Sequence, residues 1–122
     1  MFRLTVEQTF SAAHRLRISG HKCENLHGHN WRVCVTIEGR ELREDGMLMD
    51  FHDLKALVGA VVGRLDHAYL NDVPPFDRLN PTTENICRHI GEELAARLPH
   101  GLSVHAVQVF ETDGNSGAWL PD

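Results

Sequence analysis

The stretch HNWRVCVTIEG, residues 29–39, alternates in polarity and sets the arrangement of the segments around it. One face carries His29, Trp31, Val33, Val35 and Ile37, and the other carries Arg32, Thr36 and Glu38. A period of two is typical of a strand with one buried face. We therefore expect a half-buried strand that ends at Gly39.

A similar alternation opens the chain. Phe2, Leu4, Val6 and Phe10 share one face, and Arg3, Thr5, Glu7 and Thr9 share the other. Two such strands joined by a connection pack well as an antiparallel pair with a common apolar face. We expect this pair to form the start of the sheet.

Two segments with helical periodicity follow. Leu54, Leu57, Val58, Val61, Val62 and Leu65 recur at spacings of three and four, and either Asp50 or Asp53 is placed to cap them. The second segment begins near Thr82-Thr83-Glu84, carries Ile86, Ile90, Leu94 and Leu98, and ends at Pro99 and Gly101. Both are predicted to be amphipathic helices.

The remaining segments complete one domain over residues 1–122. Residues 46–51 are compatible with a further strand or with an irregular start to the first helix. Ser103 to Phe110 predicts a third strand, residues 113–117 a turn, and Ala118 to Leu120 a short last strand. The order β-β-α-α-β-β predicts an α+β fold with two helices on one face of an antiparallel sheet.

Composition narrows the class of protein. The chain has 122 residues, a formal net charge of −5, nine histidines and three cysteines. Its 42% hydrophobic and 24% charged residues are typical of a folded domain. No apolar run approaches the roughly 18 residues that span a bilayer, and the acidic balance disfavours nucleic-acid binding. Three cysteines do not make a disulfide framework, so we expect a reduced, cytoplasmic, soluble domain.

The histidines suggest a metal site. His27 and His29 project to the same side of an extended chain, about 7 Å apart, where they can converge on one zinc ion. Antiparallel pairing brings His14, at the end of the first strand, beside them. The His-x-His pair alone is compatible with an incidental placement, but His14 and Cys23 favour an open zinc site that binds substrate.

Other reactive residues have alternative interpretations. Cys23 is either a ligand or a catalytic thiol, and Cys34 and Cys87 are interpreted as packing residues. Asp66-His67 closes the first helix, where the helix dipole favours an imidazolium, and is either a surface pair or a proton relay. Glu111 ends the third strand and is either solvated or directed into a cleft. His21, His52, His89, His100 and His105 are assigned to the surface.

Five separated motifs together resemble the 6-pyruvoyltetrahydropterin synthase / 6-carboxytetrahydropterin synthase family over essentially the whole chain. They are Phe10-Ser11-Ala12-Ala13-His14, Cys23-x3-His27-Gly28-His29, Leu65-Asp66-His67, Pro81-Thr82-Thr83-Glu84 and Glu111. The three residues between Cys23 and His27 resemble the carboxytetrahydropterin branch of queuosine biosynthesis. The pyruvoyl branch typically has a longer insertion there. Trp31 is less typical of the family.

The resemblance implies a T-fold with a four-stranded antiparallel sheet. Three such sheets join into a barrel, and two trimers stack as a homohexamer with active sites at subunit interfaces. The implied reaction converts 7,8-dihydroneopterin triphosphate into 6-carboxy-5,6,7,8-tetrahydropterin, acetaldehyde and triphosphate. The alternatives are pyruvoyl-type elimination of triphosphate, a non-catalytic pterin- or zinc-binding module, and a structural zinc domain.

The same resemblance implies residue roles. His14, His27 and His29 hold zinc as a Lewis acid, Cys23 is the base, and Asp66 and His67 relay protons. Glu111 binds the pterin amino and ring N–H groups, and Thr82, Thr83 and Thr112 are further pterin contacts. Arg15, Arg17 and Lys22 lie near the metal motif and are candidates for binding the triphosphate.

Overall fold

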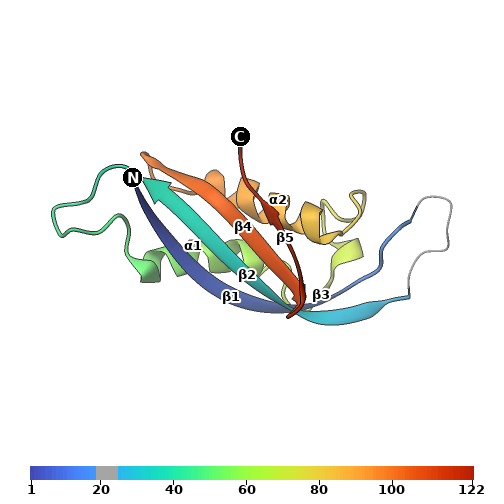
Figure 1. The fold of residues 1–122 in the computed structure, drawn as a ribbon. Helices are drawn as coiled ribbons and strands as arrows, with labels where there is room; N and C mark the ends of the chain where they lie inside the picture. Colours follow the sequence, from blue (N-terminus) through green and yellow to red (C-terminus); the bar gives the residue numbers. More distant parts are fainter. Residues whose placement is uncertain (19–24) are drawn as a thin grey trace.

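The computed structural model describes residues 1–18 and 25–122. Two helices cover one face of a five-stranded sheet, whose strand order is β3-β1-β2-β4-β5 (Figure 1). The strands are β1 (Phe2–His14), β2 (His27–Gly39), β3 (Ala68–Tyr69), β4 (Leu102–Thr112) and β5 (Asn115–Trp119). The helices are α1 (Phe51–Val62), α2 (Thr83–Ala95) and the short 3-10 turn η1 (Leu70–Asp72). The α+β class and the helices on one face are as predicted.

The long hairpin of β1 and β2 is the part that positions the histidines. The two strands pair antiparallel along their whole length, from Phe2 opposite Gly39 to His14 opposite His27. Phe10, Ala12 and His14 alternate on the side that faces the helices, as do Val33 and Val35 of β2. The predicted strand pair is therefore confirmed, and its register fixes which residues meet at its open end.

The sheet differs from the predicted four-stranded antiparallel one by the added strand β3. Ala68 and Tyr69 pair parallel with Ala12 and Ala13, and the His67 backbone N–H donates to the Ser11 carbonyl at 2.6 Å. The sheet is therefore mixed. Two residues are too few to show a period, so the alternation of polarity could not predict this strand.

Both helices are shorter than the apolar pattern predicted. Asp50, rather than Asp53, caps α1 by accepting from the His52 backbone N–H at 2.7 Å. Helix α1 ends at Val62, yet Leu65 stays fully buried because the following turn keeps it against the core. Helix α2 is capped by Thr82 and ends at Ala95, ahead of Pro99. Residues 46–50 form no strand and lead irregularly into α1, which begins at Phe51.

The core lies between the helices and the inner face of the sheet. Most of its fully buried members come from α1, α2, β2 and β4, and they include Leu54, Ile86, Ile90, Leu94, Val33, Val35, Val107 and Val109. The outer face of the sheet is polar, with Thr5 bonded to Thr36 and Arg3 paired with Glu38. Neither helix of the described ranges is long and apolar enough to cross a membrane.

Candidate metal centre

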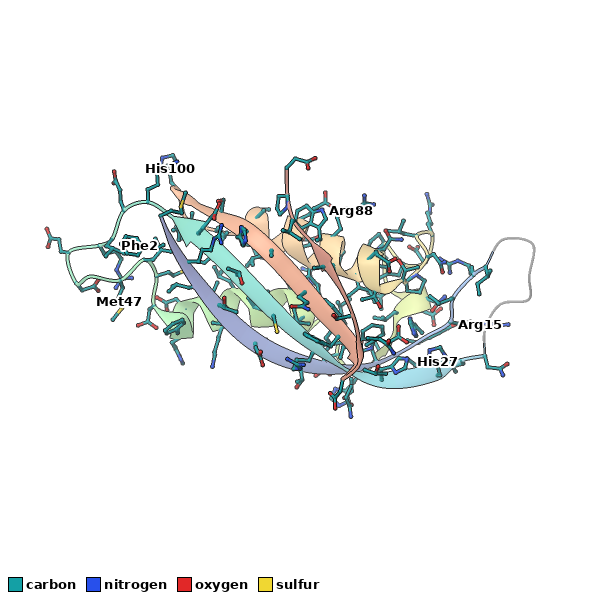
Figure 2. The ribbon with its side chains drawn as sticks, in the orientation of Figure 1. Phe2, Arg15, His27, Met47, Arg88 and His100 are labelled. Atoms are coloured by element: carbon teal, nitrogen blue, oxygen red, sulfur yellow. The ribbon has the colours of Figure 1, made fainter. Side chains whose placement is uncertain are left out.

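Three imidazoles meet at the end of the sheet where β1 finishes and β2 begins. The rings of His14 and His27 lie 4.6 Å apart between centroids, those of His27 and His29 4.7 Å, and those of His14 and His29 5.4 Å. Figure 2 shows His27 and Arg15 at one end of the molecule and Phe2, Met47 and His100 at the other. The predicted convergence of the three histidines is thus observed.

Backbone carbonyls set the ring orientation of two of these histidines. The Nδ1 of His14 lies 2.8 Å from the Pro81 carbonyl, and the Nδ1 of His27 lies 2.8 Å from the Asn25 carbonyl. A carbonyl only accepts, so each Nδ1 carries the hydrogen and each Nε2 of the neutral ring keeps a lone pair. This arrangement is typical of metal-binding histidines.

The Nε2 atoms of His14 and His27 face each other, and their lone pairs favour a cation between them. The two Nε2 atoms are 2.9 Å apart, and neither neutral ring has a hydrogen left to share with the other. Burial lowers the pKa of His14, which favours its neutral form. Two lone pairs at this distance are stabilised by a positive charge between them.

His29 supplies a third donor atom and Glu111 a fourth. The Nε2 of His29 is buried and, among the described residues, has no aligned hydrogen-bond partner, although Glu111 Oε1 is 3.1 Å away. One donor atom from each of the four residues lies within 4.8 Å of the others. A buried imidazole nitrogen with no hydrogen-bond partner has its lone pair available to a cation. These four residues could hold a metal ion.

The contact of Glu111 with His29 is a feature that the sequence interpretation missed. Val33 pairs with Val109, and Glu111 follows at the next inward position of β4. The alternation of Val107, Val109 and Glu111 indicates that Glu111 points to the inner face of the sheet. Placing it beside His29 also requires the register of β2 against β4, which the sequence does not give. The other carboxylate oxygen of Glu111 accepts from the Thr83 hydroxyl at 3.2 Å.

The other two predicted pterin contacts are engaged elsewhere. The Thr82 hydroxyl accepts from the Asn85 backbone N–H at 3.1 Å as the cap of α2. The Thr112 hydroxyl accepts from the Asn115 side chain at 3.0 Å, in the exposed turn between β4 and β5. Of the three threonines, Thr83 is the one bonded to a residue of the metal group.

Asp66 and His67 form a pair at the edge of β1. One oxygen of Asp66 accepts from the Ser11 backbone N–H at 2.9 Å, and the other lies 3.0 Å from His67 Nδ1. The hydrogen bond from Ser11, followed by the charge of His67, lowers the pKa of Asp66. The His67 side chain is 82% exposed. Across the described part of the chain, no hydrogen bond or ion pair joins this pair to the three histidines.

The pair also differs from its predicted position at the end of a helix. Helix α1 stops at Val62, and His67 lies beyond the following turn with a positive φ of 56°. The helix dipole therefore does not account for the orientation of His67; the carboxylate of Asp66 does.

Two asparagine side chains hold the segment that leaves β1. Asn71 accepts from the Arg15 backbone N–H at 2.9 Å and donates to the Arg15 carbonyl at 2.7 Å. Asn80 makes the same two bonds with Arg17, each at 2.8 Å. We call these two pairs of bonds the amide clamps. The guanidinium of Arg17 donates to the Phe76 carbonyl at 3.2 Å, whereas the Arg15 side chain is exposed.

Predictions were also made for cysteines and other residues that are not members of the metal group. Cys23, Lys22 and His21 lie outside the described residues. Cys87 is buried as predicted, and burial raises the pKa of its thiol to about 11. Cys34 is half-buried on the outer face, where its thiol donates to Glu7 at 3.2 Å.

Two of the histidines assigned to the surface, His89 and His105, are half-buried instead; His105 lies on β4 with its Nδ1 3.5 Å from Glu38. His89 is half-buried and packs edge-on against Phe76, with the ring centroids 5.3 Å apart. Burial lowers the pKa of His89.

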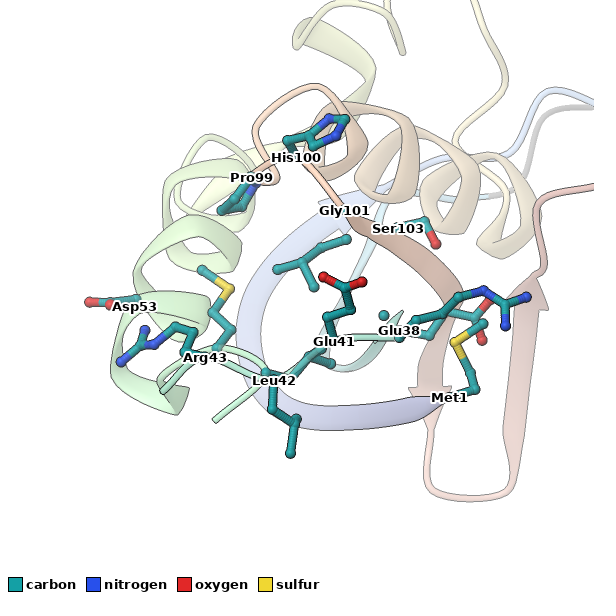
Figure 3. Close-up of a pocket in the computed structure, with 15 residues that line it drawn as sticks. Met1, Glu38, Glu41, Leu42, Arg43, Asp53, Pro99, His100, Gly101 and Ser103 are labelled. Carbon is teal, nitrogen blue, oxygen red and sulfur yellow. The ribbon is translucent and has the colours of Figure 1, made fainter. Parts of the chain in front are cut away.

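A wider hollow lies at the opposite end of the sheet (Figure 3). It measures about 750 Å³ and is lined by charged side chains that include Glu38, Glu41, Arg43 and Asp53. Gly39 in its wall is twelve residues along β2 from His27, which at strand geometry is roughly 40 Å. This hollow is therefore separate from the metal centre.

Comparison with known proteins places these features in a family. The family model described as 6-pyruvoyl tetrahydropterin synthase matches residues 3–120. A protein of Archaeoglobus fulgidus, provisionally named a 6-carboxy-5,6,7,8-tetrahydropterin synthase, is 46% identical over 109 positions, covering 88% of this chain and 86% of its own. The human 6-pyruvoyl tetrahydrobiopterin synthase is 39% identical over 122 positions, covering 88% of this chain and 83% of its own.

A solved structure agrees with the whole fold. The 6-pyruvoyl tetrahydropterin synthase of Caenorhabditis elegans superposes with a TM-score of 0.83 at 28% identity. The match covers 100% of this chain and 98% of that one.

Proposed function

Because the chain belongs to the 6-pyruvoyl tetrahydropterin synthase family, we propose that it is a zinc-dependent 6-carboxy-5,6,7,8-tetrahydropterin synthase of queuosine biosynthesis, acting in the cytoplasm. The reaction would convert 7,8-dihydroneopterin triphosphate into 6-carboxy-5,6,7,8-tetrahydropterin, acetaldehyde and triphosphate. The observation that carries this proposal is the group of His14, His27, His29 and Glu111, in which the buried Nε2 of His29 has no aligned hydrogen-bond partner among the described residues.

The donor set suits zinc. Imidazole nitrogens are ligands that zinc prefers, whereas magnesium and calcium prefer oxygen. His14 and His27 would bind through the Nε2 atoms that their carbonyl partners leave free, and His29 through its unpaired Nε2. When bound, zinc supplies a Lewis acid for the side-chain hydroxyls of the substrate.

Glu111 is proposed to bind the pterin rather than the metal. Three histidines make an open site, and a fourth protein ligand would close it to substrate. A carboxylate can accept from the pterin amino group and ring N–H side by side. The Thr83 hydroxyl, which donates to one oxygen of Glu111, would hold the carboxylate for that contact.

The proposed proton transfers involve Cys23, Asp66 and His67. Cys23 would take the proton from the substrate side-chain carbon. Asp66 accepts from Nδ1 of His67, so the other ring nitrogen is free to accept and return a proton. The imidazole of His67 is exposed and is not bonded to the metal group of its own chain, which suits a role at the site of a neighbouring subunit.

The sheet edges support the proposed homohexamer, a dimer of trimers. Strand β3 pairs only with Ala12 and Ala13, so β1 from Phe2 to Phe10 has no strand beside it on that edge among the described residues. Strand β5 is the opposite edge. Long unpaired edges are usually covered, and joining them between copies closes a barrel.

Pyruvoyl-type elimination is the second candidate. The human relative of that type is 39% identical and the A. fulgidus relative 46%. Both alignments cover 88% of this chain, but the alignment with the human protein has 122 positions and the one with the A. fulgidus protein has 109. The human protein therefore carries more inserted residues relative to this chain. The short spacing from Cys23 to His27 and the higher identity favour the carboxytetrahydropterin reaction. A non-catalytic binding module would have no need of Cys23 with Asp66 and His67.

One assay tests the reaction and the metal together. Purified protein, loaded with zinc, is incubated with 7,8-dihydroneopterin triphosphate, and acetaldehyde is measured with and without a chelator. We expect acetaldehyde to form and chelation to stop it. Consumption of substrate without acetaldehyde would indicate the pyruvoyl reaction, and no consumption would indicate a binding module. Full activity in protein shown to be free of metal would contradict the zinc requirement.

A further inference from the structure

Trp31 is packed directly against the metal group. It is fully buried on the inner face of β2, two residues after His29. Its indole lies 4.9 Å from the His14 ring and 5.3 Å from the His29 ring, between centroids, with interplanar angles of 85° and 83°. The indole therefore contacts the rings of two of the three histidines, each nearly at a right angle.

The indole itself is held in place from two sides. It stacks on Phe10, its cross-strand partner, with the centroids 5.8 Å apart and an interplanar angle of 5°. Its N–H donates to the Ala12 carbonyl at 3.2 Å, and Ala12 is the residue paired with His29. A stacked ring with a satisfied N–H has little rotational freedom.

The three histidines differ in what orients them. His14 and His27 each donate from Nδ1 to a backbone carbonyl. For His29, the structure over the described ranges gives no such hydrogen bond. Its ring contacts Trp31 on one side, and its Nε2 lies 3.1 Å from Glu111. Packing against the indole thus takes the place of the carbonyl partner that the other two rings have.

We propose that Trp31 is a positioning residue for the metal, fixing the rings of His29 and His14 so that their Nε2 atoms converge. This inference rests on the proposed function, because it assumes that the three histidines bind zinc. A phenylalanine at this position would be smaller and would lose the bond to Ala12. It would leave the His29 ring free to turn.

The other tryptophan provides a matched control. Trp119, on β5, packs against Gly91 of α2 and makes no ring contact with the histidines among the described residues. Trp31→Phe and Trp119→Phe are therefore the same chemical change at a fully buried position and at a partly buried one packed against the core. The Trp119→Phe protein also has Trp31 as its one indole, because the chain has two tryptophans.

The test compares zinc affinity by competition with a chelator in the wild-type, Trp31→Phe and Trp119→Phe proteins. Loss of a group that orients a metal ligand typically weakens affinity 10- to 100-fold. We expect a loss of about that size for Trp31→Phe and little change for Trp119→Phe. Equal affinities in the two variants would overturn the role of Trp31 while leaving the zinc site standing. A wild-type protein that binds no zinc would overturn the metal site and this inference together.

A second measurement covers the case in which Trp31→Phe fails to fold. Zinc is added to the metal-free Trp119→Phe protein while tryptophan fluorescence is recorded. Binding should change the emission of Trp31, because the ion fixes two rings in contact with the indole. Stoichiometric zinc binding with unchanged emission would contradict the proposed coupling.

Discussion

Replacing Glu111 with glutamine separates the two roles open to that carboxylate. The change keeps the shape, and the glutamine oxygen can still accept from the Thr83 hydroxyl, which lies 3.2 Å from Glu111 Oε2. What is lost is the charge and one of two acceptor positions. A pterin with two N–H donors would keep the hydrogen bond to the glutamine oxygen. Its second N–H would face the glutamine NH2 group, which is a donor and cannot accept it. Hydrogen bonds to charged groups contribute about 1.5–3 kcal/mol, so kcat/KM should fall about 10- to 150-fold.

Zinc content and steady-state kinetics distinguish the roles. A pterin-binding Glu111 predicts one zinc per chain in Glu111→Gln, unchanged zinc affinity and a lower kcat/KM. A metal-binding Glu111 predicts a loss of zinc affinity, because a neutral amide is a poor ligand beside three neutral imidazoles. Glu92→Gln on the exposed face of α2 is the matched control and should behave as wild type. Weakened zinc binding in Glu111→Gln would refute the pterin assignment, and unchanged kcat/KM would refute both roles.

Three further predictions concern the proposed base, the proposed relay, and the two histidines whose pKa burial lowers. Cys23→Ala should abolish acetaldehyde formation with zinc content near one per chain; loss of zinc with activity would instead make Cys23 a ligand. Asp66→Asn should lower kcat about 100- to 10,000-fold without loss of zinc, because an amide N–H facing His67 favours the tautomer that cannot accept a proton; a near-normal kcat would exclude the relay. Burial lowers the pKa of His14 and His89 below the ordinary value of 6.5, so below that pH the unfolded chain binds more protons than the folded chain. The stability that the two neutral rings contribute is therefore complete above pH 6.5. Urea unfolding of the metal-free protein should show stability falling as the pH drops below 6.5 through the folded pKa values, and a constant free energy of unfolding would contradict this.

The features of the fold and site that the sequence predicted depend on the period of apolar residues within a segment and on pairing between segments adjacent in the chain. Alternation in residues 2–10 and 29–37 predicted the β1–β2 pair, and its antiparallel sense placed His14 beside His27. Local signals also placed the helix starts: Asp50 was one of two candidate caps for α1, and α2 was predicted to begin near Thr82, although Thr82 was not identified as its cap.

The parts that were not predicted depend on contacts distant in the chain. Strand β3 is two residues long, and its pairing arises because the turn after α1 returns the chain to the edge of β1. The approach of Glu111 to His29 depends on the register between β2 and β4, which alternation within each strand does not specify. Asn71 and Asn80 are polar residues in a connecting region, where the sequence pattern does not distinguish a clamp from a solvated side chain.

The amide clamps and the His14–His27 pair together fix both ends of the segment between Ile18 and Asn25. The clamps hold Arg15 and Arg17 to Asn71 and Asn80, and the β1–β2 register holds residue 27. Once the ends of a connection are fixed, doubling its length costs only about 0.6 kcal/mol in closure entropy. The segment that carries Cys23 can therefore lengthen or shorten in other members of the family without moving the histidines. An insertion there can therefore change the proposed base or the substrate fit while the three histidines of the proposed metal site keep their places.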